Sequence, residues 1–329
     1  MVAGRRLAPV APLSYPRHMS APLIATTRLE LRGRTVFLRH CGADDGPALV
    51  LLHGLPTSSF LWRRCLPGVA AALPGWRIIA PDLPGYGRSA PRPGAGPRHL
   101  GRFLHALLTE LGVDRFVLAG HDLGGLVALT DAVARAGRLG GQPHPALAGG
   151  PRLERLILLD TTIYPAPLLV AGLLPAIVPP FAELSLAWLG RGGAARDDER
   201  RAQYVAGMRQ LLASDTTLTD AEWAEYAQPY GTITGWREAT RSIRALAAQA
   251  PFVLRCLAHL RDLTLPTRLI WAEHDPFFPL ATAERLRRAI PGAEARVHVI
   301  PGGGHFPQED RPELVTRLIA EFAGASGLV

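Results

Sequence analysis

The chain has 329 residues and 48% of them are hydrophobic, which suffices for one large α/β domain with an insertion or for two modest domains, and excludes a globally disordered chain. Its formal net charge of +8 at pH 7 comes from arginines scattered along the sequence, since no lysine occurs. With no recognisable nucleic-acid-binding module, this charge does not indicate a nucleic-acid partner.

The first 26 residues are rich in proline, which interrupts any signal-peptide core. We therefore expect residues 1–26 to form a flexible N-terminal extension and the protein to be cytoplasmic. The three cysteines, Cys41, Cys65 and Cys256, lie far apart and match neither a metal-binding spacing nor a disulfide framework. We expect reduced thiols in the core.

Short apolar or β-branched runs alternate with helical stretches from residue 27 onward, which predicts a mostly parallel sheet covered by helices on both faces. Several of the runs are apolar throughout, as expected for strands buried on both faces. The eight predicted strands are RLELRG (28–33), TVFLRH (35–40), ALVLLH (48–53), RIIAPD (77–82), RFVLAG (115–120), RLILLD (155–160), TRLIWA (267–272) and ARVHVI (295–300).

Two segments depart from this alternation. Residues 137–152 are rich in glycine and proline and indicate a surface loop. Residues 161–262 contain helical patterns but no convincing strand, with a capping box predicted at Thr219 and Glu222. We interpret 161–262 as a helical lid inserted after the sixth strand, and 27–160 with 263–329 as the core. The apolar stretch 166–182 is short for a bilayer span and contains four prolines, so membrane contact is not expected.

Five motifs follow predicted strands, at the edge where open α/β sheets place their sites. In chain order they are LLHGLPTSSFLWRR, APDLPGYGRS, AGHDLGG, IWAEHDPFFP and IPGGGHFPQED. Together they resemble the α/β-hydrolase superfamily, and Asp122 in AGHDLGG resembles the nucleophile of its aspartate-using branch. The resemblance implies an eight-stranded sheet, a strained strand-to-helix turn at the nucleophile, and the order nucleophile, acid, histidine. Here that order is Asp122, Asp275, His305.

An aspartate at this turn suits displacement at a saturated carbon, because a carboxylate is already ionised near neutral pH. The product would be a covalent alkyl ester of Asp122. His305, oriented by Asp275, would then activate the water that hydrolyses this ester. The backbone N–H groups of Leu55 and Leu123 are predicted to stabilise the oxyanion.

Glycines 120, 124 and 125 around the nucleophile are expected to allow the tight turn and close helix packing. Asp160, which follows the sixth predicted strand, is a rival to Asp275, since some relatives of this branch carry their acid there. His53 and Pro56 are interpreted as structural, and His121 as a packing residue near the site. A catalytically inactive fold with Asp122 as a helix cap remains an alternative.

The motifs are most similar to those of haloalkane dehalogenases, which implies hydrolysis of carbon–halogen bonds. Two departures bear on this reading. Members of that family hold the halide with a tryptophan after the nucleophile and often an asparagine after HG, whereas this chain has Leu123 and Leu55, which offer no side-chain donor. Lid residues such as Trp223 and Trp236 are candidate substitutes, and the sequence does not show whether either takes that role.

Epoxide hydrolases share the HGxP turn and the Gly-His-Asp motif, so epoxide hydrolysis is the second interpretation. It requires an acid, usually lid tyrosines in that family. Hydrolysis of another ester-like substrate, or non-catalytic binding of a small apolar ligand, are further alternatives. The lid tyrosines are Tyr164, Tyr204, Tyr226 and Tyr230, and none lies in GWREATRSIRA, the segment resembling the region where epoxide hydrolases carry one.

The sequence shows no phosphate-binding loop and no metal-ligand cluster, and the implied chemistry needs no cofactor or metal. The expected partners are a small apolar organic substrate and water. We expect a monomer or a small homo-oligomer.

Overall fold

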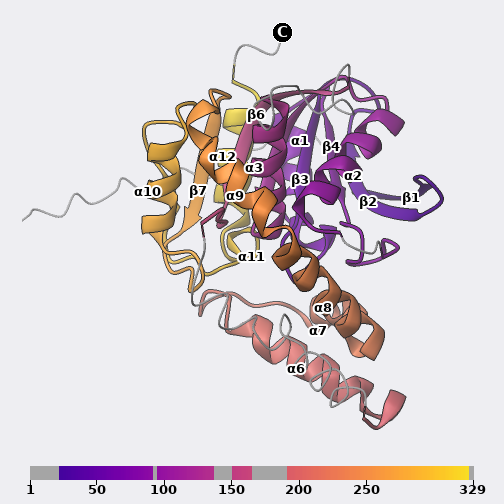
Figure 1. Cartoon of the computed structure of the whole chain (residues 1–329). Helices are drawn as coiled ribbons and strands as arrows, with labels where there is room; N and C mark the ends of the chain where they lie inside the picture. Colours follow the sequence, from indigo (N-terminus) through magenta and orange to yellow (C-terminus); the bar gives the residue numbers. More distant parts are fainter. Residues whose placement is uncertain (1–21, 92–94, 137–149, 165–190, 326–329) are drawn as a thin grey trace, which may run out of the picture.

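The computed structural model describes residues 22–91, 95–136, 150–164 and 191–325, and an eight-stranded sheet forms the centre of the molecule (Figure 1). The strand order is β1-β2-β4-β3-β5-β6-β7-β8, with β1, β2 and β4 paired antiparallel and the remaining neighbours parallel. The strands are β1 (Ala25–Glu30), β2 (Thr35–Gly42), β3 (Ala48–Leu52), β4 (Arg77–Pro81), β5 (Arg115–His121), β6 (Arg152–Leu159), β7 (Thr267–Ala272) and β8 (His298–Ile300).

Successive side chains of a strand point to opposite faces of the sheet, and in the central strands both sets are buried. In β3, Val50 packs on one face with helices α2 and α3, while Leu49 and Leu51 pack on the other face with α1 and α12. An uninterrupted apolar run is thus required, since both faces are covered by helices. The helices of the core are α1 (Leu66–Ala72), α2 (Pro97–Glu110), α3 (Leu123–Arg135), α10 (Leu280–Ala289), α11 (Pro307–Asp310) and α12 (Pro312–Ala323).

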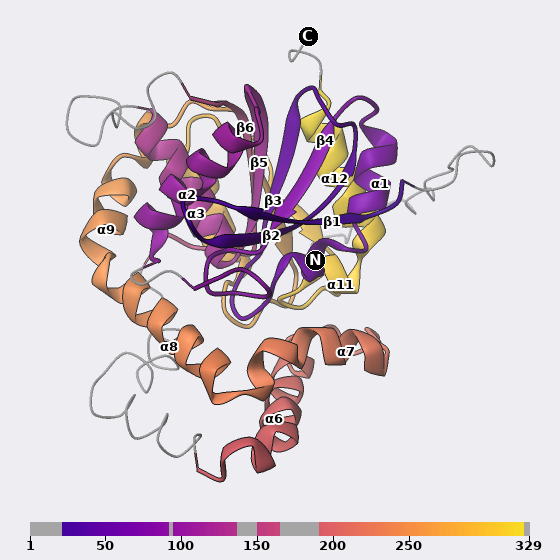
Figure 2. The same cartoon turned by 90° about the vertical axis from the view of Figure 1, so that its right-hand side faces the viewer.

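Between β6 and β7 the described residues contain helices and no strand, as predicted for this insertion. Helices α6 (Asp197–Arg209), α7 (Asp220–Ala227) and α8 (Ile233–Ala248) form a separate layer beyond one edge of the sheet (Figures 1 and 2). Helix α9 (Ala250–Ala258) follows α8 and packs against α3 of the core. We call the layer α6–α8 the cap.

The cap is held to the core by arginine–carboxylate pairs. Arg63, which follows the short 3₁₀ helix after β3, binds both Glu222 of α7 and Glu309 of α11. Arg39 of β2 binds Glu225 at 2.8 Å, and Arg88 binds the same carboxylate with both oxygens. These pairs fix α7 over the loops that follow β3 and β4.

All eight predicted strands are confirmed, with small shifts at their ends. The strand β1 begins at Ala25, inside the predicted N-terminal extension, because residues 25–30 pair in register with residues 35–40 of β2. The predicted capping box is also confirmed, since Thr219 accepts from the Glu222 N–H and Glu222 binds back to the Thr219 N–H. The glycine-rich loop 137–149 and the apolar stretch from 166 lie outside the described residues.

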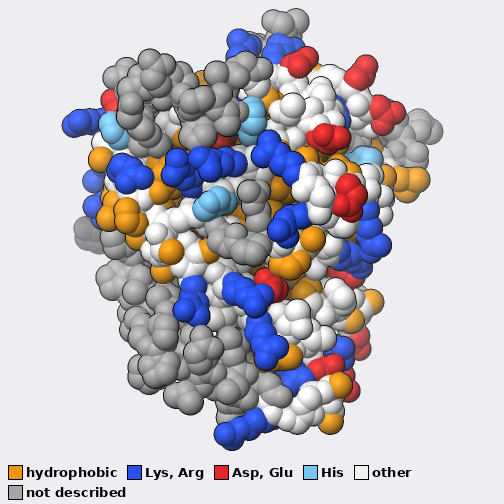
Figure 3. Space-filling view, turned by 45° about the vertical axis from the view of Figure 1, so that its right-hand side comes forward, with side chains coloured by type: hydrophobic (Ala, Val, Ile, Leu, Met, Phe, Trp, Pro, Cys, Tyr) orange, Lys and Arg blue, Asp and Glu red, His pale blue; other side chains and the backbone are white. Residues whose placement is uncertain are grey.

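The three cysteines are free and buried. Arginine side chains are spread over both the core and the cap on the face shown in Figure 3. No helix within the described ranges combines the length and apolar character needed to cross a bilayer.

Candidate active site

Asp122 stands at the junction between β5 and α3, in a backbone conformation that is unusual for a residue with a side chain. Its φ is 50° and its ψ is −117°, so the chain turns sharply between His121 and Leu123. The turn needs glycine nearby: a Cβ at Gly124 would lie 2.5 Å from the Leu52 carbonyl oxygen, and one at Gly54 would lie 2.4 Å from the Asp122 Cβ. The strained turn therefore presents the Asp122 carboxylate at the carboxyl edge of the sheet.

The Asp122 carboxylate lies in a pocket of backbone donors. Its Oδ1 accepts a hydrogen bond of 2.7 Å from the Leu55 N–H. Burial raises the pKa of Asp122 above its ordinary value, while the charge of His305 and the N–H groups of Leu123 and Leu55 oppose that rise. Oδ1 is thereby held by the Leu55 N–H, which leaves Oδ2 as the oxygen able to attack.

His305 and Asp275 form a buried pair beside this carboxylate. The Nδ1 of His305 donates to Asp275 Oδ2 at 2.8 Å, and the other oxygen of Asp275 accepts from the N–H groups of Phe277 and Phe278. Burial lowers the pKa of His305, but the charge of Asp275 and its hydrogen bond raise it above the ordinary value overall. Within the described ranges Nε2 of His305 makes no hydrogen bond, so this nitrogen is free to take a proton.

Asp160, the rival acid, contacts a different group. Its Oδ1 accepts from the Ala272 N–H at 2.8 Å, and no hydrogen bond joins it to His305. Burial and the neighbouring charge of Asp275 raise its pKa well above the ordinary value, which favours a neutral carboxyl. A neutral acid cannot stabilise an imidazolium, so the geometry favours Asp275 as the partner of His305.

Two further histidines brace the loops around the site. His53 Nδ1 donates to the Gly54 carbonyl at 3.0 Å, and its Nε2 accepts from the Leu83 N–H at 2.9 Å. His121 Nε2 donates to the His305 carbonyl at 2.7 Å. Burial, together with the charge of His305, lowers the pKa of His121 to about 3, so its ring stays neutral. The hydrogen bonds of the His53 ring join the loops that follow β3 and β4, and that of the His121 ring joins the end of β5 to the loop of His305.

The cap aromatic residues divide into two groups. Tyr204 and Tyr230 stack with ring centroids 4.5 Å apart, and the Tyr204 hydroxyl donates to the carbonyl of Pro56, next to Leu55. Trp236 packs against Tyr230, but its indole N–H donates to the Tyr230 carbonyl at 2.9 Å. The proposed donor of Trp236 is therefore already used within the cap.

The other three aromatic candidates lie against charged side chains. The Tyr226 hydroxyl donates to Glu309, the Trp223 ring faces the Arg209 guanidinium, and Tyr164 packs under Arg285. Tyr226 thus belongs to the contact between α7 and α11, and Tyr164 to the surface of α10. Neither hydroxyl is available to a substrate at Asp122.

Sequence reasoning missed Asp310, which joins the cap to the loop of His305. Its Oδ1 accepts from the Ala213 N–H and the Thr216 hydroxyl, while Oδ2 accepts from the Gly304 N–H at 2.7 Å. The N–H of His305 also donates to the Leu211 carbonyl. The position of Asp310 in GGGHFPQED gave no signal for its contacts with the cap, because Ala213 and Thr216 lie 97 and 94 residues earlier in the chain.

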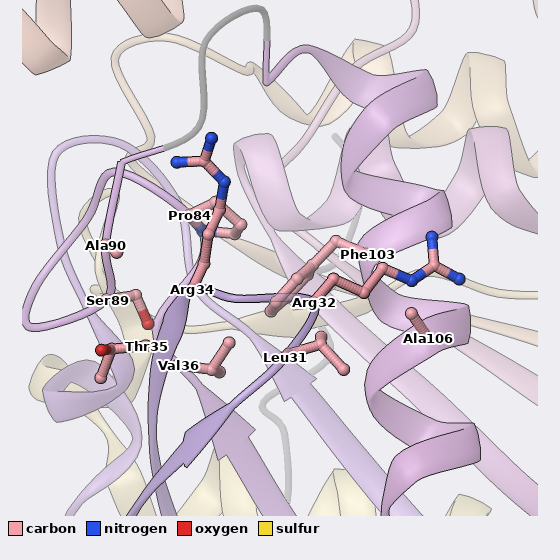
Figure 4. A pocket seen from close by; sticks show the side chains of 10 residues that line it. All are labelled: Leu31, Arg32, Arg34, Thr35, Val36, Pro84, Ser89, Ala90, Phe103 and Ala106. Atoms are coloured by element: carbon pink, nitrogen blue, oxygen red, sulfur yellow. The ribbon is translucent and has the colours of Figure 1, made fainter.

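One cavity of about 170 Å³ lies away from this site, between the β1–β2 turn and α2 (Figure 4). Its apolar floor includes Val36 and Phe103, and the side chains of Arg32 and Arg34 extend from it in different directions. None of the sequence-predicted site residues lines it. Among the described residues no group of three or more His, Cys, Asp or Glu side chains could hold a metal ion.

The alpha/beta hydrolase family matches residues 49–318, which run from the second residue of β3 past β8 and include Asp122, Asp275 and His305. The chain belongs to the alpha/beta hydrolase family. It is a hydrolase of this family, with the fold that the sequence motifs predicted.

The hydrolase is similar to curated proteins of different specificity. It is 28% identical to a 2-hydroxy-6-oxononadienedioate/2-hydroxy-6-oxononatrienedioate hydrolase of Cupriavidus pinatubonensis, over 89% of this chain and 92% of that protein. It is 28% identical to haloalkane dehalogenase 2 of Mycobacterium bovis, over 89% and 92%, and 27% identical to epoxide hydrolase 3 of Xenopus tropicalis, over 88% and 74%.

Solved structures show the same fold. The crystal structure of the haloalkane dehalogenase DbeA from Bradyrhizobium elkani superposes with a TM-score of 0.71 at 24% identity, covering 91% of this hydrolase and 97% of that chain.

Proposed function

We propose that the hydrolase attacks a saturated carbon with Asp122, forms an alkyl ester, and releases the product by hydrolysing that ester. The observation that carries this proposal is the position of the Asp122 carboxylate, held by the Leu55 N–H at 2.7 Å beside the His305–Asp275 pair. A serine in this place would need a base for the first step, whereas the carboxylate does not. The histidine is then needed for the second step.

In the first step Oδ2 of Asp122 displaces the leaving group, and the bonding electrons leave with that group. Oδ1 becomes the ester carbonyl oxygen and remains bonded to the Leu55 N–H. In the second step Nε2 of His305 removes a proton from water, and the hydroxide formed attacks Cγ of Asp122. The negative charge then develops on Oδ1, where the N–H groups of Leu55 and Leu123 stabilise it. As this charge returns, the Cγ–Oδ2 bond breaks, and the product leaves as an alcohol that takes the proton from His305, which restores the carboxylate and the neutral imidazole.

The first candidate substrate class is haloalkanes, as the motifs HGLPTSSFLWR and DLPGYGRS and the similarity to a named haloalkane dehalogenase support. Epoxides are the second. The Tyr230 ring stacks on Tyr204 near Leu55, and its hydroxyl makes no hydrogen bond within the described ranges, which favours a hydroxyl donor at this end of the site.

The test uses two variants and a panel of haloalkanes and epoxides. Asp122→Asn and His305→Gln should each abolish turnover. His305→Gln should also accumulate the alkyl ester, seen as added mass on the intact protein, because its first step is unaffected. Halide release and diol formation identify the substrate class. Turnover by both variants at the parental rate would contradict the mechanism, and absence of any adduct would favour a binding protein.

A further inference from the structure

Tyr86 lies in the loop that follows β4, within the motif DLPGYGRS. Its N–H closes a turn onto the Leu83 carbonyl at 2.9 Å, and the Leu83 N–H in turn binds His53. The Tyr86 ring meets the His53 ring edge-on, with centroids 5.6 Å apart, and only 2% of the residue is exposed. The ring is therefore fixed against the loop that forms the Leu55 donor.

The Tyr86 hydroxyl is buried and makes no hydrogen bond of ordinary geometry to any residue in the described ranges. Ser242 of α8 is its polar neighbour on the cap side. The buried hydroxyls of Tyr204 and Tyr226 differ, since they bind Pro56 and Glu309, whereas that of Tyr230 also makes no hydrogen bond within the described ranges. An unpaired buried hydroxyl is destabilising, so such a group calls for a functional explanation.

The Tyr86 ring packs on the loop that lies against Asp122. The His53 ring that Tyr86 touches is followed by Gly54, whose backbone lies against the Asp122 side chain. Burial raises the pKa of Tyr86 well above its ordinary value, and the charge of Asp122 is among the causes that raise it further. The hydroxyl thus stays protonated and can donate.

A donor is needed there. The leaving atom becomes negative as Oδ2 of Asp122 attacks, and a developing anion in a buried site requires a hydrogen bond. The side chains of Leu55 and Leu123 cannot give one, and the indole N–H of Trp236 is bonded to the Tyr230 carbonyl.

We propose that Tyr86 donates its O–H hydrogen bond to the atom that leaves the attacked carbon, in place of side-chain donors at positions 55 and 123. The proposal rests on the proposed function of Asp122. The bond from Oδ2 to carbon forms while the carbon–leaving-atom bond breaks, and its electron pair stays on the leaving atom. A halide departs hydrogen-bonded to the tyrosine. An epoxide oxygen, which stays attached, keeps the hydrogen bond until water supplies its proton.

The experiment measures the first step alone, in the His305→Gln background that retains the ester. The rate of adduct formation is followed by rapid quenching and intact-protein mass for 1-chlorohexane, 1-iodohexane and 1,2-epoxyhexane, with and without Tyr86→Phe. Removing one such donor should slow alkylation by 1-chlorohexane about 10²-fold. The effect on 1-iodohexane should be less than about 10-fold, because the larger iodide spreads its charge and needs the donor less.

The matched comparison is Tyr226→Phe, which removes a buried hydroxyl that is already bound to Glu309. Any effect of that variant acts through the cap, so it should change the rates with all three probes by a common factor. 1,2-Epoxyhexane could be the one probe that alkylates the His305→Gln parent. In that case Tyr86→Phe should slow alkylation about 10²-fold and Tyr226→Phe should not. That result supports a hydrogen bond from Tyr86 to the epoxide oxygen as it becomes an alkoxide.

The role of Tyr86 would be overturned if Tyr86→Phe slowed alkylation by 1-chlorohexane and by 1-iodohexane equally, or slowed it with no probe. Either result would leave Asp122 as the nucleophile. Failure of every probe to add mass to the His305→Gln parent would instead refute the alkyl-ester mechanism itself, and this inference with it.

Discussion

Replacing Asp275 with asparagine tests the partnership with His305 most directly. In the structure Asp275 Oδ1 accepts from two backbone N–H groups, so the amide oxygen of an asparagine should keep that position. The amide nitrogen would then face Nδ1 of His305, where Oδ2 now accepts. Two donors cannot share one hydrogen bond, so the imidazole would place its proton on Nε2 and lose the lone pair that activates water.

The expected magnitude follows from the burial of this pair. The side chain of Asp275 has 0% exposure and that of His305 2%, so water cannot replace the lost interaction. A wrong tautomer at a comparable histidine costs about 10⁴-fold in rate, and we expect ester hydrolysis to slow by about 10³–10⁴-fold. This corresponds to about 4–5 kcal/mol of activation free energy. Ester formation at Asp122 should change by less than about 10-fold, because it needs no base.

The assay follows the intact mass of the protein after rapid mixing with substrate, which separates ester formation from ester hydrolysis. Asp275→Asn should accumulate the ester. The matched control is Asp160→Asn, since burial and the charge of Asp275 raise the pKa of Asp160, which favours its neutral form, and an amide oxygen can still accept from Ala272. If Asp160→Asn accumulated the ester and Asp275→Asn turned over normally, the assignment of the acid would be wrong.

Three further predictions concern pH and the attachment of the cap. Ester hydrolysis should rise with pH along a limb centred above 6.5, because the pKa of His305 is raised and only the neutral ring accepts a proton; a limb centred below 6.5 would contradict this assignment. Glu309→Gln should lower the free energy of unfolding by about 3 kcal/mol in urea titrations, because it leaves the half-buried Arg63 with one carboxylate instead of two. Thr219→Ala should cost about 1 kcal/mol by removing the cap of α7, and Thr219→Ser should restore it.

The sequence was sufficient for the sheet and for the three residues that meet at its edge. The apolar runs of β3, β5 and β7 are unambiguous because both faces of the sheet are covered. Asp122, Asp275 and His305 each follow a strand of one parallel sheet, so their proximity follows from the topology alone.

The cap could not be predicted to the same depth. The sequence offered the indole N–H of Trp236 as a donor to the halide, but in the structure this group donates to the Tyr230 carbonyl. The unpaired hydroxyl of Tyr86 was equally invisible, because a sequence does not show which polar atoms find partners. The residues of helix α9 fell within the predicted lid, because the sequence of an amphipathic helix does not show which neighbour covers its apolar face.

The contacts of Asp310 bear on how members of this family can be recombined. Residues 211–216, between α6 and α7 of the cap, and the loop of His305 share one carboxylate, and a Cβ at Gly304 would lie 2.5 Å from the Leu211 carbonyl oxygen. The two segments are thus one mechanical unit although they are far apart in the gene. A chimera that borrows the helices between β6 and β7 from a homologue should also borrow the turn after β8, or its imidazole will be misaligned.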